Sequence, residues 1–239
     1  MPDGLVVVVP VLNEADSIGA VVAEIDRSVV DRVIVADGGS RDGTPAIARR
    51  EGAEVIEAGR GYGRACLAGA EAAGRTDILV FMDGDGADDP AEIPNLVAPL
   101  RAGTHDFVIG SRVSGTRAPG SMAWHQVGAG LLLGFGTRLL YRVRYTDMCA
   151  FRAIRREALM GLGMRELTYG WNLEMQMRAA RTGLRVLEIP VPCRNRIGGE
   201  SKVSGSLAGT LRAGSRIVTT FIRTAAAGSG PEPAAPAKG

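Results

Sequence analysis

The stretch ILVFMDGDGADDP, residues 78–90, joins a continuous apolar run to a turn that holds four aspartates, Asp83, Asp85, Asp88 and Asp89. An apolar run of this length is too short for a buried helix and is typical of a strand whose two faces are both covered. The four carboxylates repel one another unless positive charge lies close to them. The stretch therefore predicts a buried strand that ends in a charged, ligand-binding turn.

Similar short apolar runs recur on both sides of this stretch and alternate with helical patterns. We expect strands at residues 5–9, 33–35, 55–56, 78–82 and 107–109, and helices at residues 17–28, 44–51 and 63–73. This β-α-β-α order builds an open sheet with right-handed crossovers. The predicted fold class is α/β, with a mostly parallel central sheet that helices cover on both faces.

The alternation weakens after residue 110. We expect helices at residues 127–141 and 171–181 and a late strand at residues 186–189, which Pro190 and Pro192 interrupt. Three segments follow from these patterns: one domain at residues 1–205, an amphipathic C-terminal helix at residues 206–227, and a disordered tail at residues 228–239. The tail is predicted because GPEPAAPAKG has no apolar content to bury.

Length and composition fit a reduced, cytoplasmic protein. The chain has 239 residues, of which 46% are hydrophobic, and this suits one larger globular domain with or without an appendage. Its three cysteines, Cys66, Cys149 and Cys193, lie far apart and form no CxxC pair, so we expect neither disulfides nor a zinc site. The N-terminus lacks the basic region of a signal peptide, and no run of 18 or more apolar residues occurs.

Charge is distributed unevenly along the chain. Residues 1–110 carry 9 arginines against 19 acidic residues, whereas residues 111–239 carry 19 basic residues against 7 acidic ones. An acidic front and a basic back favour a metal ion on one side and an anionic ligand on the other. We expect small-molecule ligands of this kind and no nucleic-acid partner.

The acidic turn has the composition of a divalent metal site. In open parallel sheets, ligands bind beyond the carboxyl ends of the strands, where Asp37, Asp83 and Asp85 are all expected. An EF-hand is excluded, since Pro94 stands where that loop needs its bidentate glutamate. A purely structural turn is the alternative. Oxygen-only ligands favour Mg²⁺ or Mn²⁺, held largely by substrate phosphates.

A second glycine-rich stretch, AGRGYGRA at residues 58–65, raises the alternative of a dinucleotide site. It is not G-x-G-x-x-G, and it does not follow the first strand, so an NAD site of the Rossmann type is not expected. A turn that carries Arg60 and Arg64 into a helix still suits a phosphate or the edge of a nucleotide.

Six motifs together resemble the family 2 glycosyltransferases, and most closely the dolichyl and polyprenyl phosphate mannose and glucose synthases. In chain order they are PVLNEADSI, ADGGSRDGT, GRGYGRA, FMDGDGADDP, IGSR and RNRIGGESK, and the likeness runs from about residue 5 to about residue 205. The resemblance implies a nucleotide-diphospho-sugar transferase (GT-A type) Rossmann-like fold. It also implies a divalent metal, Mg²⁺ or Mn²⁺, a nucleotide-sugar donor, and inversion at the anomeric carbon.

The resemblance also implies roles for individual residues. Those matching the family's donor-binding positions are Pro10, Leu12, Asn13, Glu14, Asp37, Arg60, Gly61, Asp83, Asp85 and Ser201, and Asp83 and Asp85 match its metal-binding D-x-D motif. Catalytic positions are matched by Asp85, Arg112, Asp147, Glu174, Arg196 and Lys202. The chain departs from the pattern at Ala36, where the family has a first aspartate, and at Ala87, where members often carry glutamine.

The late basic residues suit a phosphate acceptor on chemical grounds as well. A phosphate monoester is already anionic near neutral pH, so as a nucleophile it needs positioning and charge neutralisation more than a general base. Together with this chemistry, the resemblance implies transfer of a hexose from GDP-mannose or UDP-glucose to a polyprenyl phosphate. A soluble hydroxyl or phosphate acceptor is one alternative, and a hydroxyl would need Asp147 or Glu174 as the base unless these acids pair with Arg144 or Arg178. A nucleotide-sugar-binding protein without turnover is the other alternative.

The predicted C-terminal helix has two unlike sides. Leu207, Leu211, Val218, Phe221 and Ile222 fall on one side, and Arg212, Arg216 and Arg223 fall on the other. Such a helix suits peripheral contact with the inner face of a membrane, where a polyprenyl phosphate resides. Packing on the domain, or an interface in a homo-oligomer, would produce the same pattern.

Overall fold

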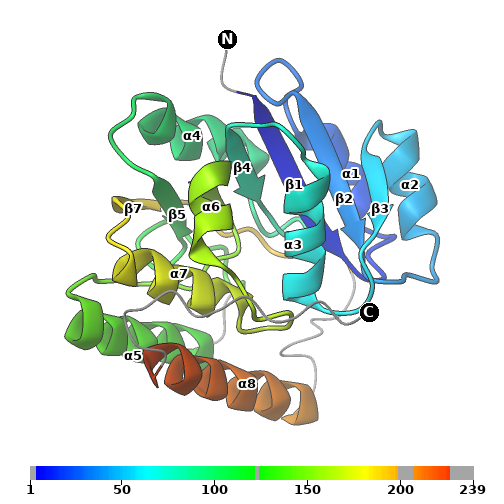
Figure 1. The fold of residues 1–239 in the computed structure, drawn as a ribbon. Helices are drawn as coiled ribbons and strands as arrows, with labels where there is room; N and C mark the ends of the chain where they lie inside the picture. The colour runs from blue at the N-terminus through cyan, green and yellow to red at the C-terminus, as the bar shows by residue number, and fades with distance from the viewer. Residues whose placement is uncertain (1–3, 122–123, 199–206, 227–239) are drawn as a thin grey trace, which may run out of the picture.

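The computed structural model describes residues 4–121, 124–198 and 207–226, and its centre is one sheet of seven strands in the order β3-β2-β1-β4-β6-β5-β7 (Figure 1). The strands are β1 Leu5–Val11, β2 Arg32–Asp37, β3 Glu54–Glu57, β4 Ile78–Phe81, β5 Phe107–Ser111, β6 Arg152–Arg155 and β7 Val186–Pro190. All neighbouring pairs are parallel except those of β6, which runs antiparallel to β4 and β5. The predicted mostly parallel α/β sheet is thus confirmed.

Helices cover both faces of this sheet. They are α1 Ile18–Glu24, α2 Thr44–Arg50, α3 Tyr62–Ala72, α4 Ile93–Arg101, α5 Trp124–Tyr141, α6 Arg156–Leu162, α7 Trp171–Arg181 and α8 Leu207–Ala226, with the 3₁₀ turn η1 Pro90–Glu92. Figure 1 shows α3 across the near face of β1 and β2, with α1 behind them. The strands β1 and β4 are buried along their whole length, as their continuous apolar sequences require.

Apart from the short 3₁₀ turn η1, three elements were not predicted, and one predicted helix is too long. The strand β6 and the helices α4 and α6 are additional. The helix expected at residues 17–28 ends at Glu24, because Ile25 adopts an extended backbone with φ −72° and ψ 118°. The late strand expected at residues 186–189 is β7, which continues to Pro190 at the sheet edge.

The helices α5 and α8 lie outside the two layers that flank the sheet. Figure 1 shows them side by side along the lower edge of the molecule, beneath α7. Within the described residues, none of the helices combines the length and the apolar content that a bilayer-crossing segment needs. The tail predicted at residues 228–239 lies outside the described residues.

Candidate active site

The acidic turn follows β4 directly and lies against the start of α1. The Ser17 hydroxyl donates to the Gly84 carbonyl at 2.7 Å, and the Asp83 amide donates to the Asp88 carboxylate at 3.0 Å. Asp85 and Asp88 are both buried, with 7% and 4% exposure. The chain therefore folds this turn tightly and holds three carboxylates close together at the carboxyl end of a central strand.

Crowding of these carboxylates disfavours their charged forms. Burial, and then repulsion from Asp85 and Asp88, raises the pKa of Asp83 to about 8. Burial, assisted by the nearby Asp85, raises the pKa of Asp88 to about 6. Additional positive charge at the turn would relieve this repulsion and lower both pKa values.

Part of the balancing charge comes from the basic half of the chain. Residues 194–197 run along the acidic turn, with the Arg194 amide donating to Ala87 O and the Ile197 amide to Asp85 O, both at 2.9 Å. The Arg196 guanidinium pairs with Asp85 at 2.8 Å, and that of Arg194 pairs with Asp89 at 2.6 Å. The acidic first half and the basic second half of the chain therefore contact each other at this turn.

The end of β1 and the loop that follows it lie next to this turn and carry four of the predicted donor-binding residues. Glu14 is buried, and its carboxylate is 3.5 Å from the Arg196 guanidinium. Asn13 has a left-handed backbone with φ 51°; its amide donates to Ser40 Oγ at 2.8 Å, and its side-chain oxygen accepts from the Arg41 amide at 2.9 Å. Pro10 is the β-partner of Ala36, and Leu12 is only half-buried.

Asp37 ends β2 and shapes the neighbouring loop. Its carboxylate accepts from the Gly39 amide at 3.1 Å and from the Ser40 amide at 3.0 Å. Because Ser40 also accepts from the Asn13 amide, the loops after β1 and β2 are joined through one serine. The structure therefore brings the predicted donor residues of these two loops to one edge of the sheet.

Arg60 and Gly61 form the turn that enters α3. Gly61 has φ 133°, and a side chain there would collide with the Leu167 carbonyl, so this position requires glycine. Arg60 is exposed. The next residue, Tyr62, points inward, and its buried hydroxyl lies beside Asp83. The glycine-rich turn thus reaches the acidic turn through one tyrosine.

Arg112 and Asp147 form a buried ion pair at the end of β5. The Arg112 guanidinium donates twice to the Asp147 carboxylate, each time at 2.8 Å, and the Arg112 amide donates a third hydrogen bond at 3.0 Å. Burial opposes ionisation of Asp147, but the hydrogen bonds and charge of Arg112 outweigh it and keep the pKa of Asp147 below its usual value. Asp147 is therefore an anion that orients Arg112. The sequence had suggested Arg144 as a possible ion-pair partner of Asp147, but the observed partner is Arg112.

The catalytic role predicted for Glu174 does not fit its environment. This side chain is fully buried, and its carboxylate accepts from the Arg178 guanidinium at 2.9 Å. The other oxygen accepts from the amides of Arg165 and Glu166 at 2.9 and 2.7 Å. The pairing with Arg178 that the sequence left open is the observed one, and Glu174 supports the segment before α7. Two further predicted residues, Ser201 and Lys202, lie outside the described residues.

Sequence reasoning overlooked Tyr62, Asp88 and Arg194. A signal existed for Arg194, because it lies two residues before Arg196, and alternate residues of an extended segment share one side. Asp88 belongs to the quoted acidic turn, although its position in the sequence does not distinguish it from its neighbour. Tyr62 had no such signal, since a tyrosine at the start of a helix is equally common on a surface.

The chemistry of the turn fits a divalent cation that a substrate helps to hold. Within the described part of the chain, no group of three or more Asp, Glu, His or Cys side chains is arranged to bind a metal by itself. Asp83 and Asp85 offer hard oxygen ligands, and Mg²⁺ and Mn²⁺ commonly complete their coordination with water and substrate phosphates. The Asp85 oxygen that pairs with Arg196 becomes available only when that ion pair opens.

Comparison with known proteins places this site in a family. The model for glycosyl transferase family 2 matches residues 6–163. An uncharacterized glycosyltransferase of Mycobacterium tuberculosis is 40% identical over 212 residues, which cover 87% of this chain and 94% of that protein. The dolichyl-phosphate hexose transferase of Haloferax volcanii is 34% identical and covers 92% of this chain and 95% of its own. The undecaprenyl-phosphate mannosyltransferase of Micrococcus luteus is 30% identical, with coverage of 84% and 88%.

A solved structure agrees with the sequence relatives. Glucosyl-3-phosphoglycerate synthase of Mycobacterium tuberculosis, in complex with Mn²⁺, UDP and glucosyl-3-phosphoglycerate, superposes with a TM-score of 0.75 at 25% identity. The match covers 94% of this chain and 80% of the synthase. It confirms the GT-A type fold predicted from the motifs. By its family match, its relatives and its fold, the chain belongs to glycosyltransferase family 2 and is an enzyme that transfers a sugar.

Proposed function

We propose that the chain transfers a hexose from GDP-mannose or UDP-glucose to a polyprenyl phosphate, with inversion at the anomeric carbon. The observation that carries this proposal is the meeting of the acidic turn with Arg112 and Arg196 at the carboxyl edge of the sheet. Both a diphosphate donor and a phosphate acceptor need such a combination, because each is a polyanion bound beside a metal site. Relatives named for dolichyl and undecaprenyl phosphate support the lipid acceptor.

In this proposal the loops after β1 and β2 bind the nucleoside of the donor. Asn13 and Asp37 fix these loops through Ser40, and the Gly61 turn closes the same side. Asp83 and Asp85 would hold Mg²⁺ or Mn²⁺, which when bound neutralises the diphosphate and the nucleoside diphosphate that leaves. Arg112, oriented by Asp147, faces the acidic turn and neutralises anionic oxygens of the donor or the acceptor.

The state of the two candidate bases favours a phosphate acceptor over a hydroxyl. A hydroxyl nucleophile needs a group that takes its proton. Asp147 binds Arg112 with both carboxylate oxygens and has a lowered pKa, which makes it a weak base. Glu174 is enclosed by Arg178 and backbone amides. A phosphate oxygen requires no such base, since it is already deprotonated near neutral pH.

A soluble phosphorylated acceptor is the second candidate. The solved synthase that this chain resembles is also described in complex with phosphoglyceric acid, which carries a phosphate without a lipid. The same arginines could neutralise either acceptor. For both candidates we propose residues 1–205 as the catalytic unit and residues 206–227 as an appended helix.

A transfer assay distinguishes these candidates. The protein is incubated with radiolabelled GDP-mannose or UDP-glucose, Mn²⁺, and either a polyprenyl phosphate in detergent or phosphoglyceric acid. We expect label in the lipid extract, and a loss of roughly 100-fold in the Asp85→Asn variant. The control Glu71→Gln changes an exposed carboxylate in the last turn of α3, at the opposite end of that helix from the Gly61 turn, and should retain activity. Label transferred only to phosphoglyceric acid would support the second candidate, and transfer to neither acceptor would contradict both.

A further inference from the structure

The outer sides of α5 and α8 expose a group of large apolar side chains. The α5–α8 face comprises Phe135, Leu139, Leu140, Val218 and Ile222, whose exposure ranges from 49% to 76%. Most other apolar side chains of this size lie in the core. Exposed apolar side chains that gather on one side of a protein commonly mark a contact surface.

The helix α8 leaves part of its apolar side exposed. Among the α8 side chains that the structure describes, Thr220 and Thr224 are buried, and Ile217 and Phe221 are half-buried. Thr220 donates to the buried Glu166 carboxylate at 3.0 Å. Its apolar residues Val218 and Ile222 face away from the protein. A helix that only covered a core would bury its whole apolar side, so the exposed part around Val218 and Ile222 is suited to a further partner.

Glycines let α5 pack closely against its neighbours, one of which is α8. A side chain at Gly134 would collide with the Tyr145 carbonyl, so α5 lies directly on the backbone that precedes Asp147. A side chain at Gly136 would come within 2.7 Å of the Phe221 ring, so α8 packs beside α5. Both helices lie along the same edge of the molecule (Figure 1).

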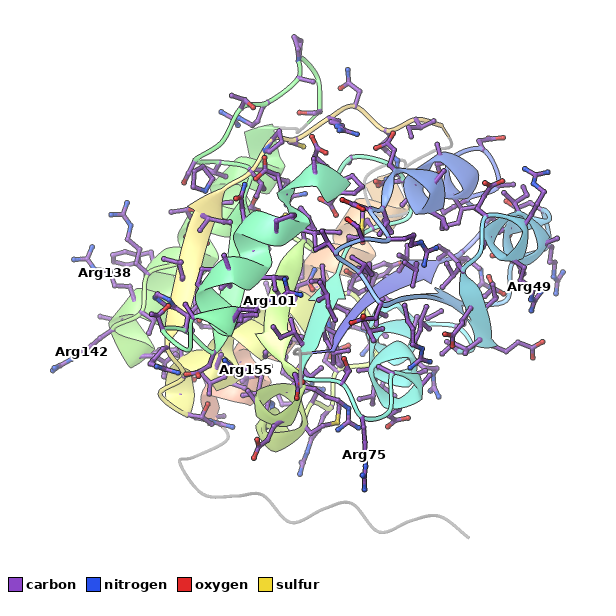
Figure 2. All side chains as sticks on the ribbon, turned by 90° about the horizontal axis from the view of Figure 1, so that it is seen from above. Arg49, Arg75, Arg101, Arg138, Arg142 and Arg155 are labelled. Carbon is purple, nitrogen blue, oxygen red and sulfur yellow. The ribbon has the colours of Figure 1, made fainter. Side chains whose placement is uncertain are left out.

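Exposed arginines lie at the end of α5 and along α8, in stretches of sequence that contain no acidic residues. Residues 112–146 and residues 201–231 contain no Asp or Glu. Arg138, Arg142 and Arg216 are exposed, and among the described residues no acid pairs with any of them. Figure 2 shows Arg138 and Arg142 projecting outward at the end of α5.

We propose that the α5–α8 face docks onto the surface of an anionic lipid bilayer. Apolar side chains bounded by arginines match a surface whose headgroups are negative and whose interior is apolar. A second copy of this chain is a poorer match, because a two-fold interface would bring the same arginines together without acids to pair them. The inference goes beyond the proposed function, since docking does not require transfer.

Docking at this face would also bring the lipid close to the candidate active site. The inner side of α5 borders Asp147, which orients Arg112. A phosphate on a membrane lipid could thus reach Arg112 along the side of α5 while its chain stays in the bilayer. This consequence rests on the proposed function, whereas the docking itself is tested without donor or acceptor.

Co-sedimentation with vesicles tests the proposal. The full chain is mixed with phosphatidylcholine vesicles that contain or lack phosphatidylglycerol, at low and high ionic strength. We expect binding to the anionic vesicles that weakens as salt is added. The Arg138→Gln/Arg142→Gln variant should partition roughly thirtyfold more weakly, given about 1 kcal/mol for each arginine near an anionic surface. Its matched control, Arg49→Gln/Arg75→Gln, removes two exposed arginines from other parts of the molecule and should stay within about twofold (Figure 2).

A second pair of variants tests the apolar contribution. Leu139→Ser/Ile222→Ser should also weaken vesicle binding, whereas Met160→Ser on α6, another exposed apolar residue, should not. Unchanged melting temperatures establish that each variant is folded. The proposal is overturned if the wild-type chain ignores anionic vesicles, or if the control pairs weaken binding as much as the α5–α8 variants. It is equally overturned if light scattering shows a dimer that Leu139→Ser/Ile222→Ser dissociates while no vesicle binding occurs.

Discussion

The ion pair between Asp85 and Arg196 gives each residue one partner in this structure and, in the proposed function, a different partner when donor and metal are bound. Arg196 neutralises the same carboxylate that is expected to bind a divalent cation. The pair is partly exposed, with 31% of the Arg196 side chain and 10% of the Asp85 side chain accessible, so it can open at modest cost. Arg196 then becomes available to the phosphates of a substrate.

Removing this arginine should strengthen the binding of metal alone. In Arg196→Gln, Asp85 loses a competing cation, so the affinity for Mn²⁺ in the absence of any nucleotide should rise roughly tenfold, equivalent to about 1.4 kcal/mol. Electron paramagnetic resonance of free Mn²⁺ measures this directly. Arg194→Gln is the matched control, because Arg194 pairs with Asp89 and Glu24 and leaves the Asp85 pair intact. Equal Mn²⁺ affinity in the wild type and in Arg196→Gln would contradict the proposed competition.

At the same scale, the sequence predicted which residues carry charge but not what each one contacts. The acidic turn was expected to need positive charge, and the late arginines were expected to bind anions. That Arg196 lies on Asp85 depends on the path of more than a hundred intervening residues, which no local pattern encodes. Glu174 and Asp147 show the same limit. Glu174 pairs with Arg178 and supports the segment before α7, whereas Asp147 pairs with Arg112 and orients it. Burial and the ion-pair partner distinguish these two roles, and residue type does not.

Among the elements, strongly periodic or continuously apolar segments were predicted correctly, and those with mixed signals were not. The strand β6 has the sequence RAIR, and its Arg152 is fully buried, where it donates to Cys149 O at 3.0 Å and lies 5.7 Å from the centre of the Phe107 ring. An arginine at this position predicts exposure, so the strand could not be recognised. Pro94 and Pro99 obscured α4, although Pro94 is tolerated in its first turn.

One buried carboxylate, that of Glu166, makes two side-chain hydrogen bonds to α8. Glu166 accepts from the Thr220 hydroxyl at 3.0 Å and from the Arg223 guanidinium at 2.9 Å. The Glu166→Gln substitution keeps the shape of the side chain but removes the negative charge that pairs with Arg223. The hydrogen bonds from Thr220 and Arg223 are then poorly satisfied. Since each such loss costs about 1–3 kcal/mol, amides of α8 should exchange roughly ten to a hundred times faster.

Hydrogen exchange followed by mass spectrometry measures this change. Glu157→Gln is the control, because Glu157 is exposed on α6 and no ion pair joins it to α8 among the described residues. Exchange in the strands β1 and β4 should be the same in all three proteins. Unaltered exchange of α8 in Glu166→Gln would show that the helix is held mainly by other contacts.

In the whole molecule, the acidic first half and the basic second half of the chain determine where charge lies on the folded surface. Arginines from residues 194–197 neutralise the turn that ends β4, and the outer arginines of α5 and α8 remain available to other anions. In the two proposals, one chain presents two anion-binding regions: the edge of the sheet for a donor and its metal, and the α5–α8 face for a lipid surface. The proposed reaction requires both, because its donor is soluble and its acceptor is a membrane lipid.

The central claim is that Asp83 and Asp85 bind a nucleotide sugar together with a divalent cation. Calorimetric titration of GDP-mannose and UDP-glucose into the protein, with and without Mn²⁺, tests it most directly. We predict that one of the two donors binds in a Mn²⁺-dependent manner, and that Asp85→Asn loses this dependence while it melts like the wild type. Unchanged Mn²⁺-dependent affinity in Asp85→Asn, or no binding of either donor to the wild-type protein, would contradict the claim.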